Sequence, residues 1–281
     1  MTVFLSVVGG IALLLLLLYL LAICPGKRRD MVPFDRVPFA HRGLYDNSPA
    51  LPENSLPAFR RARDKGYGVE LDIQFTADRQ IVVFHDKDLT RMCGVEKRVD
   101  SLTYDELQQY VLLGGEERIP RLADVLEVLQ DTPVVCEIKS YGPIGSTALC
   151  EAAAPQLEAY PGALCVESFN PFMIRWFRRH RPAVRRGILS MRFKEESEVT
   201  PAQGFLLTAL LTNFLTRPDF IAFNHEDKTA LSFRLCRRLF RATTIAWTIR
   251  SHEEEAACRD AFDNVIFEHY EPRLEAQEGE P

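Results

Sequence analysis

Short apolar runs alternate with helix-like segments along most of this 281-residue chain, and this alternation constrains the fold more than any other feature. The runs are continuous and rich in Val, Ile and Phe, as buried parallel strands are. They cover residues 37–40, 67–73, 81–84, 134–138, 163–166, 187–189, 220–223, 245–249 and 265–267. The alternation predicts an α/β fold, a TIM (β/α)8-type barrel, with an open doubly wound sheet as the alternative.

These strand candidates are one more than a barrel of eight requires. The link from residue 73 to residue 81 is too short for a crossover helix, so it is expected to form a hairpin outside the regular barrel. Helices are expected in most of the other gaps. They cover residues 56–65 with Asn54 or Ser55 as the cap, residues 103–110 with the capping-box pair Thr103 and Glu106, and residues 122–129, 170–181 and 251–262.

The first apolar segment, residues 3–24, is dominated by leucine and contains no charged residue. At 1.5 Å per residue it extends roughly 33 Å, enough to cross the hydrocarbon core of a bilayer. Basic residues 27–29 follow it, so the positive-inside rule predicts a single-pass membrane protein whose folded domain faces the cytoplasm. A lipoprotein processed at Cys24 is a weaker alternative, because bulky Ile23 precedes the cysteine.

The expected organisation is a transmembrane anchor over residues 1–24, a linker over residues 25–37 and one barrel domain over residues 38–281. A second apolar segment, residues 204–215, is too short to span a bilayer. It is predicted to be a buried helix, with a helix lying at the membrane interface as the alternative.

Charge and cysteine content exclude some classes of protein. The net charge of −5 gives no sign of nucleic-acid binding, and the basic run at residues 175–186 is interpreted as a solvated face. The seven cysteines are an odd number and none forms a CxxC pair. They are therefore expected to be small buried side chains in a reducing compartment rather than a disulfide framework.

Charged residues interrupt the apolar runs at the points where four predicted strands end. The first ends in His41-Arg42, the second in Glu70 and Asp72, the third in His85, and the fourth in Glu137 and Lys139. The active sites of barrel enzymes lie at the carboxyl ends of the strands. These side chains are therefore expected to converge at one end of the barrel.

The geometry of a β-strand indicates that the carboxylates lie close together. Glu70 and Asp72 are two residues apart and project from the same face of a strand, and Glu137 would add a third carboxylate. Carboxylates held together away from water repel one another unless a cation compensates them. An all-oxygen set of ligands predicts a site for one divalent cation, Mg²⁺ or Ca²⁺.

These residues belong to a longer pattern, and through it the chain resembles the glycerophosphodiester phosphodiesterases over about residues 38–270. The matching segments read HRG at 41–43, PENSLPAF at 52–59, ELDIQFTAD at 70–78, VVFHDKDLTR at 82–91, IPRLADVL at 119–126, EIK at 137–139, SFNP at 168–171 and WTIR at 247–250. The resemblance implies a membrane-anchored member of bacterial type, with a TIM barrel and one divalent ion. It further implies hydrolysis of glycerophosphodiesters to glycerol 3-phosphate and an alcohol.

The resemblance also implies roles for individual residues. His41 and His85 would be the acid–base pair, Glu70, Asp72 and Glu137 the metal ligands, Arg42 and Lys139 the phosphate contacts, Glu53 and Asn54 a supporting motif, and Trp247 part of the pocket wall. The expected partner besides the substrate is the lipid bilayer, through residues 3–24. Two other functions stay open: a lysophospholipase D or phospholipase C-like cleavage of membrane lipids, and a binding module without catalysis.

The last part of the chain departs from the family pattern. Phe267-Glu268 stands where a Thr-Asp pair is common, and Arg250 stands where asparagine is common. We expect these differences to alter the pocket wall and the choice of headgroup without touching the chemistry.

Overall fold

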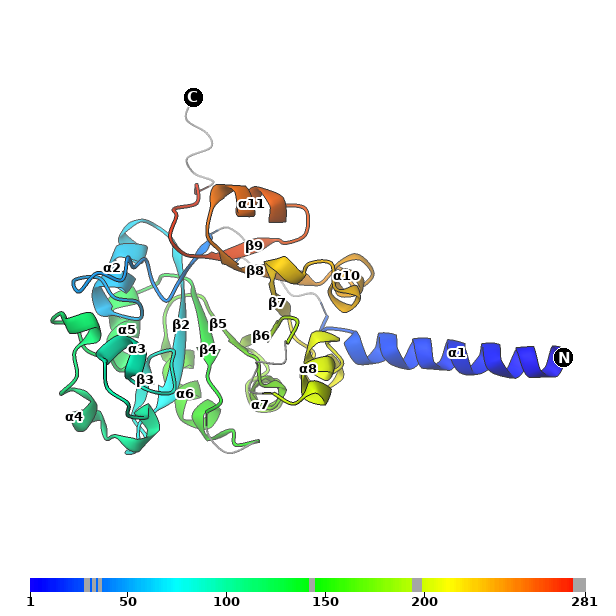
Figure 1. The fold of residues 1–281 in the computed structure, drawn as a ribbon, viewed down its shortest axis with the longest axis horizontal. Coiled ribbons are helices and arrows are strands. Elements are labelled where there is room, and N and C mark those ends of the chain that lie inside the picture. Colours follow the sequence, from blue (N-terminus) through cyan, green and yellow to red (C-terminus); the bar gives the residue numbers. More distant parts are fainter. Residues whose placement is uncertain (28–30, 32–33, 35–36, 142–144, 194–198, 275–281) are drawn as a thin grey trace, which may run out of the picture.

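The computed structural model describes the chain apart from residues 28–30, 32–33, 35–36, 142–144, 194–198 and 275–281. Its described part contains a closed barrel of parallel strands (Figure 1), because β1 (Phe39–His41) pairs with both β2 and β9. The other barrel strands are β2 (Gly68–Phe75), β4 (Val134–Ile138), β5 (Leu164–Ser168), β6 (Arg185–Ser190), β7 (Phe220–Asn224), β8 (Thr243–Ile249) and β9 (Asn264–Phe267). The predicted TIM barrel is confirmed, and the open-sheet alternative is wrong.

The ninth strand, β3 (Ile81–Val83), lies outside the ring. It pairs antiparallel with β2, with Val83 opposite Ile73, so the predicted hairpin is confirmed. Short helices follow before β4 and pack over their own apolar cluster on the side of the barrel away from the N-terminus (Figure 1). They are α3 (Thr90–Cys93), η1 (Val99–Ser101), α4 (Tyr104–Leu107) and η2 (Leu112–Gly114).

The remaining helices surround the ring. They are α2 (Leu56–Asp64), α5 (Leu122–Leu129), α6 (Ala148–Ala159), α7 (Pro171–His180), α8 (Pro201–Thr208), α9 (Asn213–Thr216), η3 (His225–Asp227), α10 (Leu231–Arg238) and α11 (His252–Cys258). Ser55 caps α2, and the Thr103–Glu106 capping box begins α4 as predicted. The expected length of α4 is wrong, because the amide of Gln109 bonds to the carbonyl of Glu106 and turns the chain after Leu107.

Inward-facing side chains fill the barrel below its carboxyl end. Phe39, Val135 and Phe220 belong to one buried cluster. Glycine is required beside these rings: a Cβ at Gly187 would lie 2.2 Å from the ring of Phe220. Because neighbouring strands share this cluster, the ring of strands forms a rigid base for residues at the strand ends.

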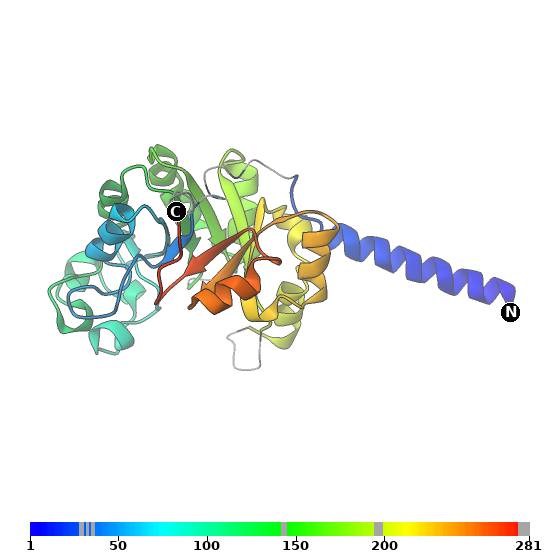
Figure 2. The same cartoon turned by 90° about the horizontal axis from the view of Figure 1, so that it is seen from above.

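The N-terminal segment forms one long helix, α1 (Thr2–Ile23), which projects from the barrel in Figures 1 and 2. The helical stretch over residues 4–23 is long and apolar enough to cross a membrane. The predicted linker over residues 25–37 falls partly outside the described residues, and so do Arg28 and Arg29, on which the predicted orientation depends.

Two further predictions concern buried apolar residues. The seven cysteines all lie in the described part and are unpaired, and five of them are buried as expected. The prediction of one buried helix over residues 204–215 is wrong. The segment forms the end of α8 and most of α9, and Phe205 and Phe214 are 66% and 50% exposed.

Candidate active site

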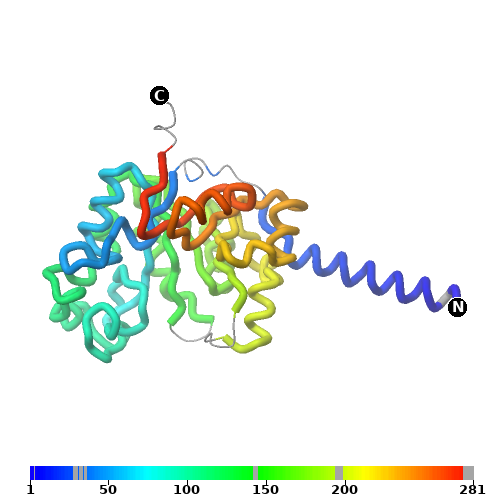
Figure 3. Tube along the Cα trace, turned by 45° about the horizontal axis from the view of Figure 1, so that its top comes forward, coloured from blue at the N-terminus to red at the C-terminus, as the bar shows by residue number. Residues whose placement is uncertain are grey.

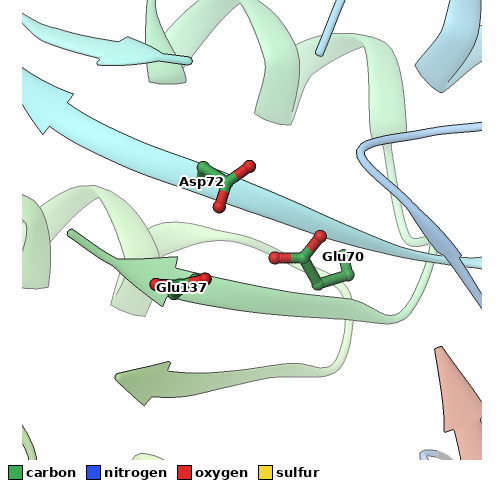
Figure 4. Close-up of side chains that lie close together, drawn as sticks. All are labelled: Glu70, Asp72 and Glu137. Carbon is green, nitrogen blue, oxygen red and sulfur yellow. The ribbon is translucent and has the colours of Figure 1, made fainter. Parts of the chain in front are cut away.

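Three carboxylates from two neighbouring strands meet at the carboxyl end of the barrel. Glu70 and Asp72 project from β2, and Glu137 projects from β4 directly opposite Asp72 (Figure 4). Each offers an oxygen within 4.8 Å of the others. Their residues are only 2%, 0% and 8% exposed. The expected convergence is confirmed, while their role as metal ligands stays a prediction.

A fourth carboxylate, Glu167, joins this group from β5, where it is the register partner of Glu137. It is buried, and its Oε2 has no hydrogen-bond partner among the described residues. Burial and repulsion between these acids raise the pKa of Glu70, Glu137 and Glu167. We did not predict Glu167 from the sequence, although it directly follows the apolar run at residues 163–166.

Lys139 lies inside the carboxylate cluster. Its Nζ is 2.8 Å from both Asp72 Oδ1 and Glu137 Oε2. Burial alone would raise the pKa of Asp72, but Lys139, His85 and Arg42 together hold it well below the usual value. Lys139 and Arg42 supply two positive charges beside four buried carboxylates, and the raised pKa values of three of these acids reflect burial and a repulsion that a bound cation would relieve. The oxygen-only donor set and this repulsion fit a divalent cation held by Glu70, Asp72 and Glu137.

His41, at the end of β1, is held by Glu268, which follows β9. The Nδ1 atom of His41 is 2.6 Å from Glu268 Oε2, and its Nε2 lies 3.9 Å from Glu70 Oε2. Glu268 also accepts hydrogen bonds from the Tyr45 hydroxyl and from Arg250 Nε, each at 2.8 Å. Contrary to expectation, Glu268 and through it Arg250 are linked to a predicted catalytic residue, because pairing of β9 with β1 brings Glu268 beside His41.

This contact fixes the protonation pattern of His41. A carboxylate accepts hydrogen bonds, so Nδ1 carries the proton and Nε2 faces the carboxylate cluster. Burial lowers the pKa of His41 and Arg42 lowers it further, against the opposing effect of Glu268. Burial would raise the pKa of Glu268, but His41, Tyr45 and Arg250 hold it below the usual value.

His85 has a parallel arrangement after β3. Its Nδ1 is 2.7 Å from Asp86 Oδ1, and Asp86 Oδ2 accepts a 2.7 Å hydrogen bond from Arg91 Nε. The main-chain carbonyl of His85 accepts from the Tyr141 hydroxyl at 2.6 Å. Both histidines therefore have Nδ1 bound to a carboxylate, so Nε2 of each ring is the nitrogen that could exchange a proton with a substrate.

The motif around Glu53 supports the site from the loop between β1 and α2. Glu53 binds Arg42 through a 2.7 Å contact and Arg91 through contacts of 2.7 and 2.8 Å. Asn54 donates to Asp72 Oδ2 at 2.9 Å. These contacts place Arg42 beside the carboxylate cluster, since its Nε is also 3.5 Å from Asp72 Oδ2.

Trp247, on β8, belongs to a group of aromatic rings. Phe169 meets Trp247 edge to face at 5.5 Å and Phe193 at 6.1 Å between ring centroids. The indole Nε1 of Trp247 is buried and has no hydrogen-bond partner within the described residues. Its predicted place in the pocket wall stays a prediction.

Replacing Glu53 with glutamine is expected to lower the free energy of unfolding by about 3 kcal/mol at neutral pH. Burial would raise the pKa of Glu53, but Arg91 and Arg42 lower it to about 2. Because this is below the ordinary value of 4.5, the carboxylate's stabilisation is present above that pH and is lost as the pH falls through about 2.

Urea unfolding of both proteins between about pH 7 and pH 2 measures this effect. The difference in the free energy of unfolding between wild type and Glu53→Gln should become smaller below about pH 4.5. Glu116→Gln, which removes an exposed carboxylate, is the control. A difference for Glu53→Gln that is constant with pH would contradict the charge argument.

Comparison with known proteins finds a family and relatives that match this chain over different lengths. The family described as glycerophosphoryl diester phosphodiesterase matches residues 41–218. A glycerophosphodiester phosphodiesterase of Caldanaerobacter subterraneus subsp. tengcongensis is 33% identical over 161 residues, which are 53% of this chain and 65% of the relative. A human lysophospholipase D is 36% identical over 100 residues, 31% of this chain and 32% of that protein. The matched segments thus span less than two thirds of each of these two relatives.

Solved structures support the fold. A phosphodiesterase of Oleispira antarctica, solved with the product sn-glycerol-3-phosphate, has a TM-score of 0.64 and 21% sequence identity. The alignment covers 82% of this chain and 91% of that one. At this level of identity the similarity concerns the barrel itself.

Proposed function

This chain belongs to the glycerophosphoryl diester phosphodiesterase family, and on this basis we propose that it hydrolyses glycerophosphodiesters to glycerol 3-phosphate and an alcohol. One observation carries the proposal beyond family membership. Two histidines, each held at Nδ1 by a carboxylate, border a buried cluster of four acids at one end of the barrel. This combination supplies two proton-transfer groups beside a site for a cation.

We assign the cation to Glu70, Asp72 and Glu137, and Mg²⁺ and Ca²⁺ both suit these oxygens. A cation bound there would offset the negative charge of the phosphodiester and stabilise charge that develops in the transition state. Arg42, adjacent to the cluster, would bind a phosphate oxygen, with Lys139 as the second cationic side chain.

The histidines move the protons. The Nε2 atom of one histidine accepts a proton from the attacking hydroxyl, and the Nε2 of the other donates a proton to the departing alkoxide. The glycerol hydroxyl next to the phosphate is the first nucleophile, and water then opens the cyclic phosphate. Glu268 and Asp86 keep the two imidazole rings in the orientation that these transfers need.

We also propose that the protein is a membrane-anchored member of bacterial type, with an anchor over residues 1–24, a linker over residues 25–37 and the catalytic domain over residues 38–281. The length and apolar character of α1 support the anchor. The basic residues that follow it in the sequence favour a cytoplasmic domain.

The experiment for the main proposal uses the full chain purified in detergent. It should release glycerol 3-phosphate from glycerophosphocholine and glycerophosphoglycerol, lose this activity with a chelator and regain it with Mg²⁺ or Ca²⁺. Activity that persists after exhaustive chelation would refute the requirement for a cation. The absence of product from every glycerophosphodiester would refute the proposed substrate class.

Cleavage of lysophospholipids is the second candidate, since a human lysophospholipase D is 36% identical to this chain over 100 residues. A membrane-anchored barrel would also lie beside a bilayer that contains such lipids. Faster turnover of lysophosphatidylcholine than of glycerophosphocholine, measured in the same detergent, would favour this candidate over the first.

A further inference from the structure

The end of α1 is built into the barrel domain. Ile23 is fully buried in a cluster with residues from β7, β8 and α10. Its carbonyl accepts a 2.8 Å hydrogen bond from Asn213 Nδ2, and the carbonyl of Cys24 accepts a 2.7 Å hydrogen bond from Arg217. The last carbonyls of a helix need such partners, and here the barrel provides them. The position of the barrel relative to the end of α1 is therefore fixed.

A cavity of about 510 Å³ opens at this junction, away from the carboxylate cluster. One wall is the chain that follows α1, and the other comes from α7, β6 and the segment after α9. Four cationic side chains and one carboxylate line it: Lys27, Arg178, Arg186, Arg217 and Asp219. The lining therefore carries a clear excess of positive charge.

Main-chain carbonyls hold these arginines in place. Arg178 donates to the carbonyls of Phe214 and Leu215 at 3.0 and 2.8 Å. The side chain of Arg186 is only 7% exposed, and its Nη1 lies 3.5 Å from Asp219 Oδ2. Carbonyl groups orient the guanidinium of Arg178 without cancelling its charge, whereas Asp219 offsets the charge of Arg186, so the cavity keeps a net positive charge.

We propose that this cavity binds the phosphate of an anionic phospholipid headgroup in the membrane leaflet where α1 ends. A helix that crosses the hydrocarbon core brings the residues at its end to the level of the headgroups. Lys27 and the arginines are then at the depth of the lipid phosphates. Phosphate is the group that guanidinium and ammonium side chains bind best.

The surface around the cavity supports this placement. Helices α8 and α10 flank the barrel end of α1 in Figures 1 and 3. These two helices, α9 and the residue after α10 expose large apolar side chains, Phe205, Leu206, Phe214, Leu231 and Leu239. Exposed apolar groups beside a cationic cavity are the pattern of a surface that rests on a membrane interface. The inference rests on the proposed membrane insertion of α1 and is independent of the proposed hydrolysis.

The test measures how much phosphatidylglycerol and phosphatidylcholine the full chain retains in detergent, by native mass spectrometry with a chelator present. Wild type is expected to prefer phosphatidylglycerol by roughly tenfold. The double variant Lys27→Gln/Arg178→Gln should lose that preference, since both residues line the cavity and are exposed. The control Arg60→Gln/Lys65→Gln removes the same amount of charge at α2, across the barrel from α1 (Figure 1). This variant should keep the preference for phosphatidylglycerol.

Three results would overturn the inference: equal retention of the two lipids by wild type, an unchanged preference in the cavity variant, or displacement of the lipid by equimolar inorganic phosphate. Flotation with phosphatidylcholine vesicles at alkaline pH tests membrane insertion separately. A chain that does not float refutes the anchor and this inference together. The cavity variant should hydrolyse glycerophosphocholine at the same rate as wild type. Failure of the proposed hydrolysis can therefore be told apart from failure of the proposed lipid binding.

Discussion

Glu70→Gln is expected to lower kcat/KM for glycerophosphodiesters by roughly a thousandfold or more, because it removes one of three proposed ligands of the cation. Its effect on folding should be small or even favourable. Glu70 is buried among Asp72, Glu137 and Glu167, whose charges raise its pKa, and a neutral amide relieves this repulsion. Loss of activity without loss of stability is a combination that a merely structural residue would not show.

Thermal unfolding provides a readout that does not depend on turnover. A cation present at a hundred times its Kd stabilises the native state by about 2.7 kcal/mol, so Mg²⁺ or Ca²⁺ should raise the Tm of the wild type. Glu70→Gln should lose most of this rise, whereas Glu116→Gln, at an exposed position, should keep it. An undiminished rise in Glu70→Gln would show that the cation binds elsewhere.

The second large effect is expected for the histidines. His41→Ala and His85→Ala should each lower kcat by roughly 10²- to 10⁴-fold, the range typical of general acid–base groups. His252→Ala, at an exposed position on α11, is the matched control and should be unaffected. Wild-type kcat in either active-site variant would remove that histidine from the mechanism.

Glu268→Gln should have a smaller effect on kcat, roughly ten- to a hundredfold. Glu268 accepts from Arg250 at one oxygen and from Tyr45 and His41 at the other. A carboxamide can accept at only one of its two ends, so at least one of these donors must face an NH₂ group. The pH profile of kcat should also shift, because His41 loses a charged partner, and an unchanged profile would mean that Glu268 has no part in orienting it.

The sequence was sufficient to predict the barrel because each strand is a continuous apolar run, and the outlying hairpin because of the short link before Ile81. It was also sufficient for the convergence of Glu70, Asp72 and Glu137, since position at a strand end determines where a side chain lies in a barrel. The same rule applied to the fifth run would have found Glu167.

Other features depend on contacts that the spacing of residues along the sequence does not determine. The bond between Glu268 and His41 follows from closure of the ring, which pairs the first strand with the last (Figure 3). Whether apolar residues 204–215 are buried depends on what packs against them, and composition is the same for a core helix and an exposed one. The position of Lys139 between two carboxylates is likewise decided by side-chain geometry at the barrel mouth.

Ring closure has a consequence for the protein during its synthesis. Glu268 leaves the ribosome 227 residues after His41, and at 5–20 residues per second this interval is roughly ten to fifty seconds. Throughout that time α1 has already emerged and can enter the bilayer, while His41 still lacks its carboxylate partner. With α1 as the proposed anchor, a nascent chain would reach the bilayer before its proposed acid–base pair is complete. A chain that terminates before β9 would lack Glu268 and could not form the contact with His41.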